Sequence, residues 1–240
     1  MGKGIFITGT DTGVGKTLVA CALAGHLKSL GYKVGVMKPV EAGCEERDGK
    51  LFPQDAFYLK EASGCGEPLE RVCPYSLKEP LAPSVAAEIS GVKIDIGLIE
   101  RLYREICSRH DITIVEGAGG LLVPVLPHYT YADLAKVLKL PLLVVAANRL
   151  GAINHLLLTL EHASCRDLRV LGYILNRLEA QPSLAADTNQ EALLSLTAVP
   201  CLGEIPYVEG LETNRSSLAD LFEGRLDLRP LAPVLLRKQV

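Results

Sequence analysis

A glycine-rich loop near the start of the chain constrains the fold more than any other feature of the sequence. The segment Gly9-Thr-Asp-Thr-Gly-Val-Gly-Lys16-Thr17 joins an apolar run at 4–8 to a pattern in which Val19, Leu23 and Leu27 recur at helical spacing. A strand, a glycine-rich turn, a Lys-Thr pair and a helix in this order are typical of a phosphate-binding loop. Backbone N–H groups and the positive end of the helix then point at the phosphates. The segment therefore predicts a nucleotide site.

The loop is a variant of the usual phosphate-binding pattern. In G-x-x-x-x-G-K-[ST] the first glycine falls where this chain has Thr10, and Gly9 stands one residue earlier. Lys16 would reach the β and γ phosphates, and the Thr17 hydroxyl would hold magnesium. The alternative is a structural turn with an incidental lysine, which the combination of strand, loop, Lys-Thr pair and helix disfavours. The nearest match to the N-K-x-D guanine signature, Asn176-Arg177-Leu178, lacks the aspartate.

Alternating strand and helix patterns predict the fold class. Apolar runs at 4–8, 112–115 and 140–146 are typical of strands buried on both faces, and such strands form parallel sheets covered by helices. Further patterns predict strands at 33–38 and 170–175 and helices at 55–62, 96–109, 131–138, 152–165 and 184–196. The segment 65–84 carries four prolines and suggests an irregular excursion at the sheet edge. We expect one α/β domain over 1–240, a doubly wound, mostly parallel sheet flanked by helices, of the P-loop NTPase type.

Composition narrows the class of partner. With 25 basic and 28 acidic residues, the net charge of −3 gives no general attraction to nucleic acid or to an anionic membrane surface. The longest apolar stretch, 142–147, falls far short of the roughly 20 residues of a membrane span. Seven cysteines without C-x-x-C spacing suggest reduced thiols, and the N-terminus shows no secretory pattern. We expect a cytoplasmic protein that binds small molecules.

Three charged residues fall where a nucleotide site would need them. Glu116 follows the run 112–115, so it is expected at the carboxyl end of the sheet, where open α/β proteins bind ligands. Magnesium bound to phosphates usually takes one or two carboxylates, which Glu116 and Asp55 could supply. Lys38 ends a predicted strand and could stabilise a transferring phosphoryl group or a carbamate. The structural alternatives are a turn cap for Glu116, a helix N-terminal carboxylate for Asp55 and a solvated lysine at 38.

Taken together, the motifs resemble those of the dethiobiotin synthetase family of biotin biosynthesis. The matching segments occur in order over almost the whole chain, which is more specific than a phosphate-binding loop alone. They are Thr8-Gly-Thr-Asp-Thr-Gly-Val-Gly-Lys-Thr17, Lys38-Pro-Val40, Asp55-Ala56, Pro74-Tyr75, Val115-Glu-Gly-Ala-Gly-Gly120, Ala132-Asp133, Leu150-Gly-Ala-Ile-Asn-His155 and Leu202-Gly-Glu-Ile-Pro206.

This resemblance implies an ATP- and magnesium-dependent cyclo-ligase that forms C–N bonds. Such an enzyme closes a ureido ring on 7,8-diaminononanoate with carbon dioxide, through a carbamate and a carbamic-phosphoric mixed anhydride, and releases ADP and phosphate. The resemblance also implies a homodimer with the substrate site at the interface. Nothing in the motifs requires a catalytic cysteine or histidine, and His155 is expected to be a structural helix residue.

The resemblance further implies roles for individual residues. Lys16, Lys38 and Thr12 would be catalytic, and Thr17, Asp55 and Glu116 would bind magnesium. The nucleotide would contact the loop and, through adenine, two later residues: Gly13, Val14, Gly15, Lys16, Thr17, Leu18, Asn176 and Pro206. The substrate would contact Thr12, Lys38, Glu116, Gly119, Gly151, Ala152 and Asn154, with its carboxylate at the helix N-terminus near 151–154.

Two departures from the family pattern and three rival classes bear on this interpretation. Ala42 stands where the family often has Ser or Thr, so one hydroxyl contact near the carbamate is missing, and Gly13 replaces a more usual acidic or polar residue.

A partition-type switch ATPase would carry a signature lysine where this chain has Asp11. Cobyrinate-type amide synthetases need a glutaminase domain that 240 residues leave no room for. A biosynthetic kinase that stops at a phosphorylated product would not require bicarbonate.

Overall fold

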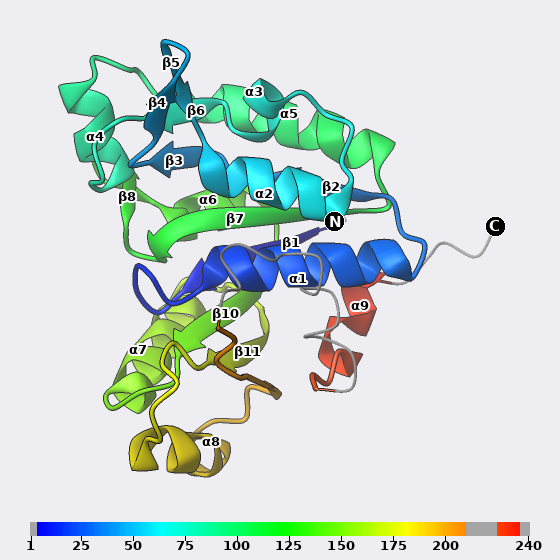
Figure 1. Ribbon diagram of the computed structural model, residues 1–240, viewed down its shortest axis with the longest axis vertical. Coiled ribbons are helices and arrows are strands. Elements are labelled where there is room, and N and C mark those ends of the chain that lie inside the picture. Colours follow the sequence, from blue (N-terminus) through cyan, green and yellow to red (C-terminus); the bar gives the residue numbers. More distant parts are fainter. Residues whose placement is uncertain (1–3, 210–224, 236–240) are drawn as a thin grey trace.

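Six parallel strands form the central sheet, in the order β12-β11-β10-β1-β7-β2 (Figure 1). The computed structural model describes residues 4–209 and 225–235. The strands of this sheet are β1 (Gly4–Gly9), β2 (Val34–Met37), β7 (Ile112–Gly120), β10 (Leu142–Ala147), β11 (Val170–Asn176) and β12 (Cys201–Ile205). The first strand lies inside the sheet between two strands from later in the chain. Because all these strands are parallel, crossover connections join them. The prediction of a doubly wound, mostly parallel sheet is confirmed.

Helices cover both faces of this sheet. One face packs against α1 (Lys16–Ser29), α2 (Gln54–Ser63), α3 (Leu69–Val72) and α9 (Ala232–Leu235), and the short helix η2 (Arg229–Leu231) lies with them. The other face packs against α4 (Pro83–Ile89), α5 (Ile96–Arg109), α6 (Tyr131–Leu138), α7 (Ala152–Cys165) and α8 (Leu184–Leu196). No helix within residues 4–209 and 225–235 has the length and apolarity that crossing a bilayer requires.

Burial on both faces explains why the strands are apolar at successive positions. Side chains alternate between the two faces of a strand. In β1, Ile5 and Ile7 share a buried cluster with α1, whereas Phe6 belongs to the cluster on the opposite face. The Phe6 ring lies 6.2 Å from the ring of Tyr131 in α6, centroid to centroid. All six residues of β1 are buried, as the apolar run predicted.

Strand β7 is longer than the sequence predicted. The apolar run ends at Val115, but the strand continues through Glu116 and the glycines to Gly120. It pairs with β1 from Gly4 opposite Thr113 to Gly9 opposite Gly120, with a register shift near the end. Glycines carry no apolar side chain, so hydrophobic patterning could not reveal this extension. Glu116 therefore lies inside a strand and not after one.

The prediction of an irregular segment at 65–84 was wrong in part. This segment contains α3, the strand β6 (Tyr75–Leu77) and the start of α4. Strand β6 pairs in parallel with β3 (Val40–Ala42) as a separate two-stranded sheet. Two more short pairs were also missed: β4 (Glu45–Arg47) with β5 (Lys50–Phe52), and β8 (Pro124–Leu126) with β9 (Tyr129–Thr130). Elements of two to four residues are too short to show a period.

Candidate functional site

The glycine-rich loop, residues 10–15, leads from the carboxyl end of β1 into the N-terminus of α1. Gly13 and Gly15 have φ angles of +74° and +90°, a left-handed conformation that glycine adopts without strain. A Cβ atom on Gly15 would lie 2.1 Å from Nδ2 of Asn176, so this position also lacks room for a side chain. Helix α1 starts without a side-chain cap and without an acidic residue in its first turn. Its first N–H groups are therefore suited to an anion.

Lys16 is the first residue of α1 and is 6% exposed. Its Nζ donates a hydrogen bond to the backbone oxygen of Asp11, 3.0 Å away, so the side chain folds back over the loop. Burial and the neighbouring charge of Lys38 lower the pKa of Lys16 to about 8. An anion bound at the loop would favour the charged ammonium.

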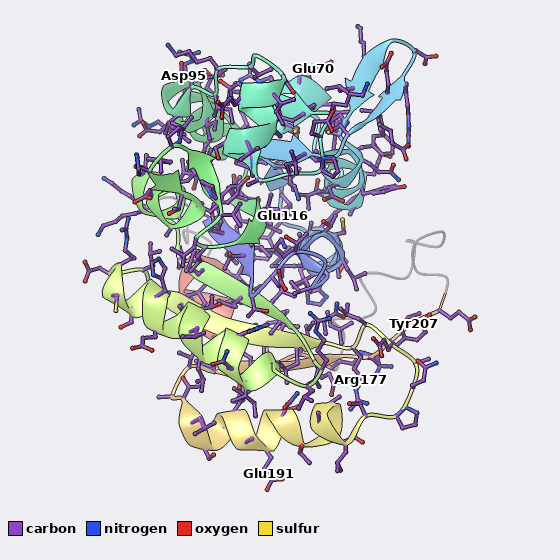
Figure 2. All side chains as sticks on the ribbon, turned by 90° about the vertical axis from the view of Figure 1, so that its left-hand side faces the viewer. Glu70, Asp95, Glu116, Arg177, Glu191 and Tyr207 are labelled. Atoms are coloured by element: carbon purple, nitrogen blue, oxygen red, sulfur yellow. The ribbon has the colours of Figure 1, made fainter. Side chains whose placement is uncertain are left out.

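Four predicted site residues meet in one partly buried cluster beside the loop. The Nζ atom of Lys38, which follows β2, lies 2.5 Å from Oε1 of Glu116 and 3.0 Å from Oδ2 of Asp55 in the first turn of α2. The Thr17 hydroxyl donates to the same Glu116 oxygen at 2.8 Å. Four parts of the chain, at α1, the end of β2, α2 and β7, thus bring together one cation, two carboxylates and a hydroxyl group. Glu116 is fully buried at the centre of the molecule (Figure 2).

The charges in this cluster depend on one another. Burial disfavours the charged form of Lys38, but the carboxylates of Glu116 and Asp55 outweigh it and raise the lysine pKa well above its ordinary value. Burial acts to raise the pKa of Asp55, whereas the charge and hydrogen bond of Lys38 hold it below its usual range. For Glu116, complete burial outweighs Lys38 and raises the pKa. Lys38 is therefore a firmly charged group at neutral pH.

The cluster has the donor set that magnesium needs. Oε2 of Glu116 is buried and has no hydrogen-bond partner among the described residues, so one carboxylate oxygen remains available. No group of three or more His, Cys, Asp or Glu side chains in the described part of the chain is arranged to hold a metal alone. Magnesium in nucleotide sites is typically held by one or two carboxylates together with phosphate oxygens. Glu116, Asp55 and the Thr17 hydroxyl fit such a site.

Glu41 is an acidic residue at this site that the sequence did not single out. It lies in β3, is 6% exposed, and accepts hydrogen bonds from the backbone N–H groups of Asp55 and Ala56 at 2.9 and 3.0 Å. Burial is the main cause that raises the pKa of Glu41 to about 7. A signal was present in the sequence, because Pro53 precedes the helix and supplies no capping side chain. An uncapped helix start needs an acceptor from another element.

The two residues expected at adenine lie together at the ends of neighbouring strands. Asn176 ends β11 and pairs with Ile205 of β12, the residue before Pro206. The Asn176 side chain donates from Nδ2 to the backbone oxygen of Val14 at 3.0 Å. Its Oδ1 is buried and has no partner among the described residues. This oxygen is a hydrogen-bond acceptor that the described residues leave free, at the strand ends where adenine is expected.

The residues expected at the substrate divide into two places. Thr12 lies against Gly119, since a Cβ atom on Gly119 would be 3.3 Å from the Thr12 hydroxyl. Gly151 caps α7, followed by Ala152 and Asn154 in its first turn. Strand β10, which precedes α7, lies on the opposite side of β1 from β7 and β2, so these residues are separated in the sheet from Lys38. An Arg149–Asp11 ion pair of 4.0 Å links the loop before α7 to the phosphate-binding loop.

A pocket of about 180 Å³ opens between the phosphate-binding loop and α7. Its walls are mainly aliphatic, with Thr10 and Gly120 of the loop region and two histidines of α7 also lining it. The lining residues are Thr10, Gly120, Leu121, Leu122, His155, Leu158, Thr159 and His162. His155, expected as a structural helix residue, is exposed and borders this pocket. The pocket suits a short alkyl chain near the phosphate site.

Comparisons with known proteins show which family the chain belongs to. A family model described as an AAA domain matches residues 3–215. The chain is 39% identical over 239 residues to the ATP-dependent dethiobiotin synthetase BioD of Thermodesulfovibrio yellowstonii, covering 96% of this chain and 99% of the relative. It is 43% identical over 207 residues to that of Aromatoleum aromaticum, covering 86% and 92%.

Solved structures show the same fold in more distant proteins. The septum site-determining protein MinD complexed with Mg-ADP from Pyrococcus horikoshii has a TM-score of 0.54 at 16% identity, covering 92% of this chain and 86% of that one. This likeness supports the fold alone. The curated relatives match at higher identity over nearly their whole length. The chain therefore belongs to the dethiobiotin synthetase family of ATP-dependent ligases.

Proposed function

We propose that this chain makes dethiobiotin from 7,8-diaminononanoate, carbon dioxide and ATP. One amine adds to carbon dioxide and loses a proton, which gives a carbamate. A carbamate oxygen takes the γ-phosphoryl group of ATP, giving a carbamic-phosphoric mixed anhydride and ADP. The second amine then attacks the carbonyl carbon, the ureido ring closes, and phosphate leaves. The observation that carries this proposal is the contact of Lys38 with Glu116 and Asp55 beside the phosphate-binding loop.

The charged residues of the site would serve the reaction by neutralising the negative charges of its phosphate and carbamate groups. Phosphoryl transfer depends on positioning and electrostatic stabilisation more than on a protein nucleophile. Lys16 and Lys38 would neutralise the γ-phosphate and the carbamate, and Thr12, beside Gly119, would contact the reacting end of the substrate. Magnesium would be held by Thr17, Asp55 and Glu116, and when bound it would neutralise charge on the phosphate oxygens. The Oε2 atom of Glu116, which has no hydrogen-bond partner among the described residues, supports this assignment.

Nucleotide recognition would combine the loop with the ends of β11 and β12. The backbone from Gly13 to Leu18 would surround the phosphates. The unpartnered Oδ1 of Asn176 would accept a hydrogen bond from the adenine amino group, and Pro206 would lie against the base. These assignments rest on the resemblance and on the placement of both residues at neighbouring strand ends.

The diamine site would be shared by two copies of the chain. The alkyl chain suits the aliphatic pocket against α7, and the substrate carboxylate suits the N-terminus of that helix, near Gly151, Ala152 and Asn154. This helix end and Lys38 lie on opposite sides of β1 in the sheet. As the resemblance implies, the α7 N-terminus that completes the site would come from a second copy of the chain, so the protein would be a homodimer.

Phosphate release tests the proposal against its rivals. The purified protein is given ATP and magnesium, and phosphate is measured with and without the diamine and bicarbonate. We expect release only when both are present. Phosphate release without either would favour a switch ATPase. Formation of ADP and a phosphorylated diamine without bicarbonate, and with no free phosphate, would favour a kinase. Binding of ADP, measured in parallel, shows that an inactive sample still has an intact nucleotide site.

A further inference from the structure

Helix α2 has no cap of its own, and Glu41 takes that place from another element. The residue before the helix is Pro53, which makes no side-chain capping contact. The first N–H groups of a helix have no partner inside it and need an acceptor. Oε1 of Glu41 accepts from the Asp55 N–H at 2.9 Å, and Oε2 accepts from the Ala56 N–H at 3.0 Å. Both carboxylate oxygens are therefore used to hold the first turn of α2.

The same short segment also holds the Asp55 side chain. Lys38 precedes Glu41 by three residues, and its Nζ lies 3.0 Å from Oδ2 of Asp55. The segment thus binds Asp55 twice, at the backbone through Glu41 and at the carboxylate through Lys38. Strand β3 is itself anchored, because Glu41 pairs with Ser76 of β6. The carboxylate of Asp55 is fixed relative to Glu116 by this arrangement.

We propose that Glu41 is a positioning residue that sets the Asp55 carboxylate for magnesium, an inference that rests on the proposed function. Both oxygens of Glu41 accept from backbone N–H groups of α2, so its observed contacts are with the helix that carries Asp55. Placing a second carboxylate beside Asp55 brings repulsion between like charges. The positive end of α2 offsets this repulsion. A helix cap alone would not require a buried carboxyl group next to the site, since Ser or Thr before the helix would serve.

Magnesium binding in the presence of ADP tests the proposal without relying on turnover. Glu41→Gln keeps the size of the side chain but has one acceptor oxygen, so one of the two N–H groups loses its partner and faces an NH₂ donor. Magnesium is titrated into the complex of protein and ADP, and its affinity is measured by calorimetry. We expect Glu41→Gln to weaken magnesium about 10- to 100-fold, as is usual when a residue that orients a metal ligand is changed. Affinity for ADP without magnesium should stay unchanged.

Asp95→Ala is the matched control. Asp95 caps α5 by accepting from the N–H of Gly97 at 2.8 Å, and it lies toward one end of the molecule, away from Glu116 at the centre (Figure 2). This variant should lower the melting temperature and leave magnesium affinity alone. If Glu41→Gln behaves in the same way, Glu41 is only a helix cap and the proposal is overturned.

Two further outcomes separate this proposal from the proposed function. If magnesium has no effect on ADP binding by the unsubstituted protein, the metal site fails and the inference fails with it. If magnesium binds there but Glu41→Gln binds it equally well, only the inference fails. Should Glu41→Gln not fold, Glu41→Asp gives the same reading, because its carboxylate is one methylene shorter and cannot hold both N–H groups as Glu41 does.

Discussion

At the residue scale, Gly15 couples the phosphate-binding loop to a strand two positions away in the sheet. Two independent features require glycine here. Its φ is +90°, and a Cβ atom at this position would lie only 2.1 Å from Nδ2 of Asn176. The sequence pattern predicted a glycine-rich turn at this place, which is consistent with the first feature. It could not predict the second, which depends on a contact between Asn176 and Val14 across 162 residues.

Gly15→Ala is expected to weaken nucleotide binding as well as stability. A left-handed alanine costs about 1 kcal/mol or more, and here the new methyl group would also displace Asn176. Gly91→Ala is the control, because Gly91 has a φ of +64° and open space within 4 Å of where the new methyl group would lie. Thermal unfolding and ADP calorimetry measure the two effects. Equal ADP affinity for both variants would contradict the displacement of Asn176.

Lys38 should be as important for stability as for chemistry. Its side chain is 4% exposed, and removing it leaves the fully buried Glu116 carboxylate without its cation. Breaking a buried pair in this way costs about 3–5 kcal/mol. We expect Lys38→Met to lose about that much unfolding free energy in urea, and Glu116→Gln in the same chain to restore part of it. Strictly additive losses would contradict the pairing of these two groups.

At the element scale, long elements were predictable and short ones were not. Helices α5, α6, α7 and α8 begin and end where their patterns predicted, because each presents an apolar face to the sheet over eight or more residues. Strand β6 and its partner β3 have three residues each, and their pairing is decided by tertiary packing. The position of Glu41 depends on that pairing, so the sequence did not reveal its part in the site.

Helix α6 allows a test of how much the capping contacts at a helix N-terminus contribute to the stability of the protein. Oδ2 of Asp133 accepts from the N–H and the hydroxyl of Thr130, each at 2.8 Å, and Arg166 pairs with its other oxygen. Partial burial acts to raise the pKa of Asp133, but these hydrogen bonds and Arg166 hold it below its usual value. We expect Asp133→Asn to lose about 1 kcal/mol of unfolding free energy at pH 7.

The loss of unfolding free energy caused by Asp133→Asn should become smaller as the pH falls. A carboxyl whose pKa is lowered by folding stabilises the protein above its unfolded pKa of about 3.9, and the contribution disappears as pH falls through the folded pKa. The difference between Asp133→Asn and the unsubstituted protein should therefore shrink in acid, measured by urea unfolding at several pH values. Asp167→Asn, whose side chain is 89% exposed, should show almost no loss at any pH. A constant difference for Asp133→Asn would refute the role of its charge.

At the scale of the whole molecule, the sheet order sets which site residues can meet. The sequence predicted the carboxyl edge as the site, and the structure brings Lys16, Thr17, Lys38, Asp55 and Glu116 together there. The sequence could not predict that β1 separates Lys38 from the start of α7, because local hydrophobic patterns do not determine the order of strands in a sheet. That separation is what motivates a shared site between two copies.

The proposed homodimer gives a prediction at this scale. Leu158 of α7 and Leu122 beside it are 57% and 62% exposed, and both border the pocket. Light scattering should give about twice the 25.8 kDa mass of one chain. We expect Leu158→Arg to favour monomers and to reduce turnover, because an unpaired charge would enter the interface. Leu194→Arg on α8, at a leucine that is 59% exposed, should remain dimeric, and a monomeric unsubstituted protein would contradict the proposal.

The incorporation of labelled bicarbonate into dethiobiotin tests the central claim most directly. The protein is incubated with ATP, magnesium, 7,8-diaminononanoate and carbon-13 bicarbonate, and the product is analysed by mass spectrometry. Because Lys38 and the phosphate-binding loop are proposed to act on a carbamate, the label should appear in the ureido carbonyl carbon of dethiobiotin, and its formation should match ADP release. Dethiobiotin without the label, or ADP release without dethiobiotin by protein that binds nucleotide, would contradict the account.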